Sequence, residues 1–229
     1  MSTLKKIGVL GGTFDPPHIG HLRLATYFAK LLHLDALLLI PSGEPWQKGS
    51  GITSAEVRLQ LTEAAGIDLA RAFLYSNIPT QVGVDRIEID RAGPSYAIDT
   101  VRALRERFGP AASLIWLMGA DSLVALPSWN SWEKLSQYVN FAVATRPHHD
   151  LKVEITPAVS AFLKEHQTTE AIALENSPAG LIYIDETLHI DLSSTSLRAQ
   201  LKSPARNSIA SAEIPTHTLE IITNLGLYQ

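Results

Sequence analysis

Two histidines three positions apart, His18 and His21, follow a pair of glycines and two prolines in the segment from Gly11 to His21. Apolar residues before the segment predict a buried strand, and those after it recur at helical spacing, so a helix is expected to begin near Ile19. The glycines permit backbone conformations and a close approach that a Cβ would block, and the helix start presents free amides to an anion. The imidazoles could donate hydrogen bonds to phosphate oxygens and stabilise charge during phosphoryl or nucleotidyl transfer. A metal-binding pair or a helix-capping histidine is the alternative.

A second group of residues that could bind an anion lies near the end of the chain, in the run DLSSTSLR of residues 191–198. Serine and threonine are preferred at helix starts, so Ser193 or Ser194 is predicted to cap a helix. Its first turn would carry Thr195 and, three residues later on the same face, Arg198. Hydroxyls, first-turn amides and a forked guanidinium could hold the outer phosphates of a triphosphate. A capped helix with a surface arginine would show the same pattern.

Both segments resemble motifs of one group of enzymes. Residues 18–21, HIGH, resemble the HxGH signature of the nucleotidyltransferase superfamily, and the longer run GGTFDPPHIGHL resembles more narrowly the bacterial nicotinate mononucleotide adenylyltransferases. Residues 191–198 resemble the ISSTxIR motif of this superfamily, with leucine for isoleucine at positions 192 and 197. The resemblance implies catalytic roles for His18 and His21 and ATP or phosphate contacts from Gly12, Thr13, Phe14, Ser194, Thr195 and Arg198.

Two further segments also resemble this family. The run PSGEPWQK of residues 41–48 looks like the family's loop with a phosphate-contacting lysine, here Lys48, and a mobile surface loop is the alternative. The run GADS of residues 119–122 is similar to a family segment that implies ATP contacts from Gly119 and Asp121. Asp121 could accept hydrogen bonds from ribose hydroxyls, although capping of the following helix would explain it equally well.

The pyridine mononucleotide is expected near a third set of segments that look like the family: RAGPSY (91–96), WNSW (129–132) and the pair Arg146-Pro147. The resemblance implies contacts from Tyr96, Ala97, Trp129 and Arg146. A helix that starts near Ser95 would expose the amides of Tyr96 and Ala97 to the carboxylate of a nicotinate ring. Ala97 stands where the family often has threonine, so selection of the carboxylate would depend on the backbone. Core roles for the aromatic residues are the alternative.

Apolar runs alternate with helical patterns along the chain, which predicts an α/β fold. Such alternation favours a Rossmann-like, doubly wound and mostly parallel sheet, with helices on both faces and ligands at the carboxyl ends of the strands. One nucleotidyltransferase domain is expected over residues 1–229, with the second phosphate motif and the closing helices in 190–229. After a first strand near Ile7 to Leu10, strands are predicted at 36–40, 84–89, 113–118 and 141–144, helices at 55–70, 96–108, 158–166 and 216–225, and a loop at 203–211.

The resemblance implies an adenylyltransferase of NAD biosynthesis that joins ATP and nicotinate mononucleotide, giving nicotinate adenine dinucleotide and pyrophosphate. The phosphate of the mononucleotide would attack ATP directly, because such a site works by positioning and charge stabilisation. Mg²⁺ is expected to be bound mainly by phosphates and water, so no protein residue is assigned as a metal ligand. The alternatives are nicotinamide mononucleotide or phosphopantetheine as the acceptor, or a nucleotide-binding sensor without catalysis. A class I aminoacyl-tRNA synthetase also carries an HIGH sequence, but it would need a tRNA-binding region and a lysine-rich second motif. This chain is short and acidic and has SSTSLR in place of that motif, which argues against a synthetase.

The composition and charge of the chain limit the classes of partner that it is expected to bind. The formal charge of -4 and the pI near 6.0 give no basic surface of the kind that binds nucleic acid or anionic membranes, so neither is expected as a partner, and the resemblance implies small-molecule substrates. The chain has no cysteine, which excludes disulfides and thiolate metal sites. Neither an apolar signal segment nor a run near the ~20 residues of a membrane helix is present, so a cytoplasmic location is expected. The sequence leaves a homo-oligomer open.

Overall fold

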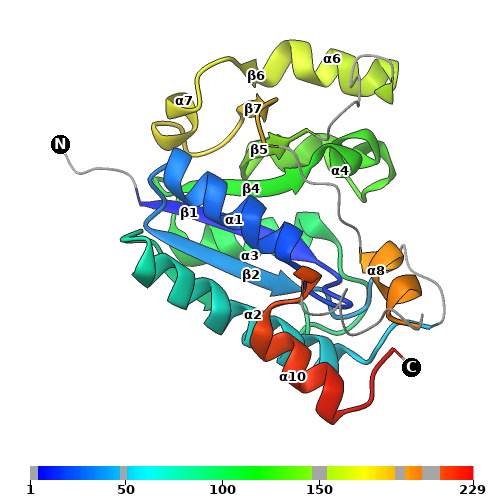
Figure 1. The fold of residues 1–229 in the computed structure, drawn as a ribbon. Helices are drawn as coiled ribbons and strands as arrows, with labels where there is room; N and C mark the ends of the chain where they lie inside the picture. Colours follow the sequence, from blue (N-terminus) through cyan, green and yellow to red (C-terminus); the bar gives the residue numbers. More distant parts are fainter. Residues whose placement is uncertain (1–4, 47–50, 146–153, 189–193, 203–211, 229) are drawn as a thin grey trace.

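A seven-stranded sheet forms the centre of the molecule, which is described here by a computed structural model covering residues 5–46, 51–145, 154–188, 194–202 and 212–228. The strand order is β3-β2-β1-β4-β5-β7-β6, and every neighbouring pair is parallel. The predicted parallel sheet is therefore confirmed (Figure 1). The strands are β1 (Lys6–Gly12), β2 (Ala36–Pro41), β3 (Gln81–Val84), β4 (Ser113–Gly119), β5 (Asn140–Ala144), β6 (Gln167–Thr168) and β7 (Ile182–Asp185).

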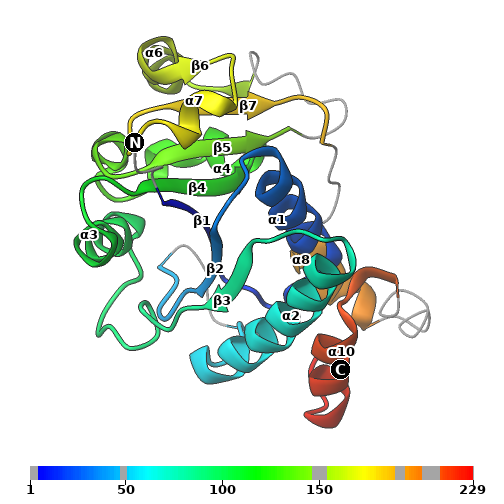
Figure 2. The ribbon, with the colours of Figure 1, turned by 90° about the vertical axis from the view of Figure 1, so that its left-hand side faces the viewer.

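Helices pack on both faces of this sheet, as the doubly wound prediction requires (Figure 2). One hydrophobic core places β-strand side chains such as Trp116 against α3 and α6, and another places side chains such as Leu117 against α1 and α2. The longer helices are α1 (Ile19–Leu31), α2 (Ala55–Tyr75), α3 (Ala97–Phe108), α6 (Pro157–His166), α8 (Ser194–Leu201) and α10 (Thr216–Asn224). The shorter ones are α4 (Ala120–Val124), α7 (Ile172–Glu175) and the 3₁₀ turns η1 (Leu126–Ser128) and η2 (Trp132–Gln137).

One predicted strand is misplaced. The strand expected at 84–89 is instead β3, which ends at Val84 on the edge of the sheet. Beyond it the Asp85 carboxylate accepts a hydrogen bond from the amide of Ile87 at 3.0 Å, and the amide of Asp90 bonds to the carbonyl of Arg86. These local bonds turn the chain away from the ladder, so the apolar residues at 87 and 89 lie in a turn.

The other predicted elements are found with small shifts at their ends. The helix expected at 55–70 continues to Tyr75, and the one expected at 96–108 begins at Ala97. The loop expected at 203–211 lies outside the described residues. Within the described part of the chain, no helix is long and apolar enough to cross a membrane.

The topology fixes where a ligand can bind. The chain passes from β1 through α1 to β2 on one side, whereas β4 pairs with the other side of β1. The carboxyl ends of β1 and β4 therefore lie at the point where the strand order reverses, and a crevice is expected there in doubly wound sheets.

Candidate active site

The loop between β1 and α1 depends on glycine for packing. A Cβ on Gly11 would lie 2.7 Å from the Trp116 ring of the neighbouring strand, so glycine is needed there for that ring to pack, and the close approach of a phosphate stays a prediction. The prediction of a special backbone conformation at the glycines is wrong, because both belong to strand β1 and neither has a positive φ. The left-handed residue is Phe14, with φ at 51°, and its ring lies edge-on to that of His21.

His18 is the N-cap residue of α1, and His21 lies in the first turn. The backbone N–H of His18 donates to Nδ1 of His21 at 3.1 Å, and the two rings stack with centroids 3.7 Å apart. Because Nδ1 accepts this bond, the neutral ring of His21 carries its proton on Nε2. Burial, and secondly the charge of His18, lower the pKa of His21 well below 6.5. At neutral pH, one nitrogen of His21 therefore caps the helix and the other carries a proton that it can donate.

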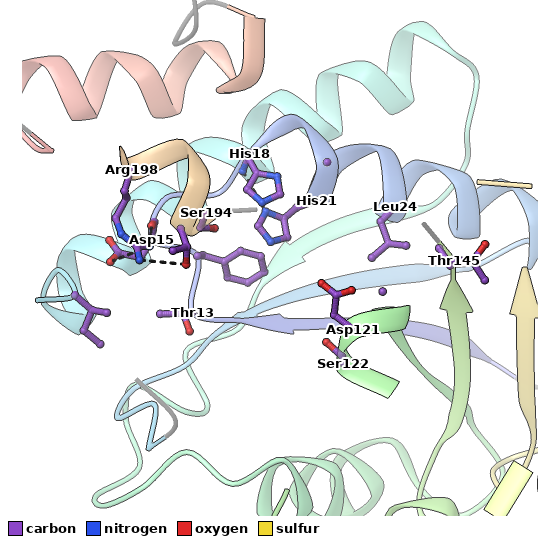
Figure 3. A pocket seen from close by; sticks show the side chains of 16 residues that line it. Thr13, Asp15, His18, His21, Leu24, Asp121, Ser122, Thr145, Ser194 and Arg198 are labelled. Atoms are coloured by element: carbon purple, nitrogen blue, oxygen red, sulfur yellow. Dashed lines mark hydrogen bonds and ion pairs between the residues drawn. The ribbon is translucent and has the colours of Figure 1, made fainter. Parts of the chain in front are cut away.

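A first cavity of about 320 Å³ lies at the carboxyl ends of β1, β4 and β5 (Figure 3). Leu24, Asp121 and Thr145 lie toward one end of it, Arg198 lies at the other, and the two histidines lie between. An apolar surface beside hydrogen-bonding groups suits a nucleoside, and a guanidinium suits its phosphates. The sequence-predicted residues that line this cavity are Thr13, Phe14, His18, His21, Gly119, Asp121, Ser194, Thr195 and Arg198.

A second cavity of about 340 Å³ adjoins the first. Its lining includes the aromatic rings of Trp46, Trp116 and Trp129, which suit a flat heterocycle. Gly12, Ala97 and Trp129 are the sequence-predicted residues that line this cavity and not the first. The residues common to both cavities are Thr13, His21, Leu24, Gly119 and Ser122, so two ligands would meet beside His21.

Helix α8 brings the second predicted anion-binding segment to the first cavity. Ser194 is its first residue, and its hydroxyl donates to the carbonyl of Pro16 at 3.0 Å. The guanidinium of Arg198 donates to the carbonyl of Asp15 at 2.6 Å and to the hydroxyl of Thr195 at 3.4 Å. Two motifs that lie 178 positions apart are thus in contact. The alternative cap, Ser193, lies outside the described residues.

Asp15 is a buried hub that sequence reasoning missed. Its side chain is 1% exposed, and Oδ1 accepts hydrogen bonds from the hydroxyls of Thr53 and Tyr228, each at 2.5 Å. Its Oδ2 lies 3.8 Å from the guanidinium of Arg198. The carboxylate therefore joins the glycine loop to α8, to the loop before α2 and to the end of the chain. An acidic residue within the glycine loop was the only signal for it.

The structure places only some of the predicted pyridine-binding residues in the second cavity. Trp129 and Ala97 line the second cavity, whereas the ring of Tyr96 packs edge-on against Trp46 at 5.9 Å and is not among the lining residues. The amide of Tyr96 donates to the carbonyl of Pro94, so Ala97 rather than Tyr96 supplies the first amide of α3. Trp132 is partly buried and packs edge-on against Phe162 of the core, which agrees with its alternative, a packing role. Lys48 and Arg146 lie outside the described residues.

A buried carboxyl group, Glu88, also lines the second cavity, and sequence reasoning missed it. It is 6% exposed and accepts a hydrogen bond from the hydroxyl of Thr100 at 2.6 Å. Burial is the largest influence on it and raises the pKa of Glu88 above 4.5, against the opposing effects of Thr100, Arg91 and Ser95. The hydroxyl of Ser95 also accepts hydrogen bonds from two amides of the loop after β2. Glu88 therefore connects that loop to α3.

Glu88→Gln is expected to change how stability depends on pH. Because the folded-state pKa of Glu88 is raised, the native protein holds this proton at a pH where the unfolded chain has lost it. The group's contribution to stability is thus fully present below pH ~4.5 and is lost as pH rises through the folded pKa. The unfolding free energy of the glutamine variant minus that of wild type should increase between about pH 4 and about pH 8, because only wild type loses stability over this range. Urea unfolding at both ends of this range measures it, and a constant difference would contradict the raised pKa.

Comparison with known proteins identifies the family of this chain. The model of the cytidylyltransferase-like family matches residues 9–200. A protein of Herminiimonas arsenicoxydans, named as a probable nicotinate-nucleotide adenylyltransferase, is 35% identical over 100% of this chain and 99% of its own. A protein of Aeromonas salmonicida with the same name is 40% identical over 97% of each chain. The chain belongs to the nicotinate-nucleotide adenylyltransferase family.

Solved structures show the same fold at much lower identity. The Plasmodium falciparum nicotinic acid mononucleotide adenylyltransferase complexed with NaAD superposes with a TM-score of 0.67 at 18% identity, covering 98% of this chain and 97% of that one. The same enzyme complexed with APC gives a TM-score of 0.65 at 17% identity, with 98% and 97% covered. The α/β architecture of the family is thus shared across distant sequences.

Proposed function

We propose that this member of the family transfers the adenylyl group of ATP to nicotinate mononucleotide, releasing pyrophosphate and forming nicotinate adenine dinucleotide. The observation that supports this most is the pair of adjoining cavities, which share a wall at Thr13 and His21. ATP would occupy the first cavity, with its phosphates toward Arg198. The mononucleotide would occupy the second, with its ring among the tryptophans. Residues at the ends of strands of the same sheet line both cavities, which supports a single nucleotidyltransferase domain over residues 1–229.

In the proposed reaction, an oxygen of the mononucleotide phosphate forms a bond to the α-phosphorus of ATP as the bond from that phosphorus to the pyrophosphate breaks. His21 would hold a proton on Nε2 and donate a hydrogen bond to an oxygen of the reacting phosphate, with His18 stacked behind it. Thr195 and Arg198 would hold the outer phosphates, where the leaving charge accumulates. Asp121 and Gly119 would contact the nucleoside.

Mg²⁺ is proposed to enter with the triphosphate. The first cavity offers the guanidinium of Arg198 and the hydroxyls of Ser194 and Thr195 to phosphates, so the ion would be held mainly by the phosphates and water. The Asp15 carboxylate is engaged with Thr53 and Tyr228. When bound, the ion would neutralise part of the phosphate charge.

The test is pyrophosphate release from ATP with a panel of acceptors: nicotinate mononucleotide, nicotinamide mononucleotide and phosphopantetheine. The proposal predicts turnover with the pyridine nucleotides and none with phosphopantetheine. Turnover with phosphopantetheine would contradict the assignment of the second cavity. Binding of ATP without turnover on any acceptor would favour the nucleotide-sensor alternative.

Nicotinate mononucleotide should be preferred over the nicotinamide form. Ala97 lines the second cavity at the start of α3, where backbone amides and the helix dipole favour an anionic carboxylate. A buried donor facing an amide N–H₂ is penalised by ~1–3 kcal/mol, so kcat/KM should differ by about tenfold or more. Equal efficiencies in parallel assays would refute this preference and leave adenylyl transfer intact.

A further inference from the structure

One buried cation beside the two cavities has no role in the reaction described above. Arg58, on α2, is 1% exposed and is not among the residues that line either cavity. Its guanidinium donates to the carbonyl oxygens of Thr13 at 3.0 Å, Thr53 at 3.0 Å and Gly43 at 2.8 Å, and also to that of Ser42. A buried charge is costly unless its hydrogen bonds are made, and here backbone carbonyls make them.

The four carbonyls come from two loops beside the cavities: Thr13 lies in the loop between β1 and α1, and the other three lie in the connection of residues 42–54 between β2 and α2. Thr13 follows β1 and lines both cavities, and Ser42 follows β2 and lines the second. Thr53 precedes α2, and its hydroxyl and amide hold the Asp15 carboxylate. The guanidinium of Arg58 thus fixes the distance between Thr13, in the wall that the two cavities share, and Ser42, in the outer wall of the second cavity.

We propose that Arg58 is a positioning residue for adenylyl transfer, which holds these loops so that the two bound substrates align, without touching either substrate. The inference rests on the proposed function. A lysine would keep the charge, but its compact ammonium lacks the rigid fork that reaches several carbonyls at once. Since a displacement of about 1 Å can cost up to ~10²-fold in rate, Arg58→Lys is expected to lower kcat by roughly tenfold, with smaller changes in both KM values.

The chain offers a matched control in Arg105. This half-buried arginine of α3 donates to the carbonyls of Gly109, Ala112, Tyr138 and Pro178, which precede β4, β5 and β7 at the opposite end of the sheet. It therefore bridges loops by the same chemistry, away from the cavities. Arg105→Lys should lower the melting temperature and leave kcat and KM unchanged at temperatures well below melting.

The experiment measures kcat, both KM values and the melting temperature for wild type, Arg58→Lys and Arg105→Lys. Wild-type turnover with nicotinate mononucleotide tests the proposed function by itself. A kcat loss confined to Arg58→Lys supports the positioning role. Wild-type kcat in Arg58→Lys, or an equal kcat loss in Arg105→Lys, overturns it.

A measurement on the wild-type protein keeps the test independent of whether the variant folds. With arginine labelled in its side-chain nitrogens, the guanidinium resonances of Arg58 should shift when ATP and then nicotinate mononucleotide are added, because the loops they bond to contact the ligands. Those of Arg105 should stay in place. Unchanged Arg58 resonances at saturating ATP would overturn the proposal.

Discussion

His21→Ala should lower kcat by about 10²–10³-fold while weakening ATP binding far less, because a donor aimed at developing charge contributes mainly in the transition state. The structure gives this expectation a specific atom. Nδ1 of His21 is occupied by the His18 amide, and the lowered pKa keeps the ring neutral, so Nε2–H is the donor that alanine removes. His18→Ala should cause a similar or smaller loss. Steady-state kinetics and calorimetric titration with ATP separate the two effects.

His33 provides the control for this substitution. Its side chain is 71% exposed and pairs with Glu175 outside both cavities. His33→Ala should therefore retain wild-type kcat. If His21→Ala and His18→Ala both kept near wild-type kcat, the phosphate role of the loop between β1 and α1 would be wrong.

Arg198→Lys is expected to raise the KM for ATP by roughly ten- to a hundredfold, because hydrogen bonds to charged groups contribute about 1.5–3 kcal/mol and an ammonium cannot reproduce a bidentate fork on phosphate. The effect on kcat should be smaller, since the outer phosphates are bound in the ground state as well. Kinetics over a range of ATP concentrations, with circular dichroism as the check on folding, measure it.

Tyr228→Phe separates loss of the phosphate contact from disturbance of Asp15. Arg198 donates to the Asp15 backbone, and the Tyr228 hydroxyl bonds to the Asp15 carboxylate, so both substitutions loosen this hub. Only Arg198→Lys changes the cation that lines the first cavity. An equal rise in the KM for ATP in both variants would assign the effect to the hub, and an unchanged KM in Arg198→Lys would make Arg198 a surface residue.

Local patterns were enough to predict the parts of the site that lie on regular elements. The strand before the histidines is an apolar run, the helix after them has a periodic apolar face, and the helix with Thr195 and Arg198 begins at serines of the kind that cap helices, all of which depend only on nearby residues. The alternation of strands and helices predicts a parallel sheet and limits its arrangements, since crossovers are right-handed, but the order of the strands was not predicted. The observed order brings the carboxyl ends of β1 and β4 together.

The residues that fix the loops could not be predicted, because their partners are distant in sequence. Asp15 bonds to Tyr228 across 213 positions, and Arg58 reaches Thr13 across 45. Arg58 is one charged residue on the apolar face of a predicted helix, and nothing in that local pattern indicated its role. Glu88 was hidden within a predicted strand, where the local bonds of Asp85 turn the chain instead. Long-range partners of this kind override local preference.

The two adjoining cavities are proposed to bind the two halves of one dinucleotide, with the phosphates beside His21. A crystal structure with nicotinate adenine dinucleotide would show whether they do. We expect adenosine in the first cavity near Asp121 and Thr145, the pyridine ring in the second against Trp129, and the bridging phosphates within hydrogen-bond distance of Nε2 of His21. A dinucleotide bound outside these cavities, or with its phosphates away from His21, would rule out this binding mode.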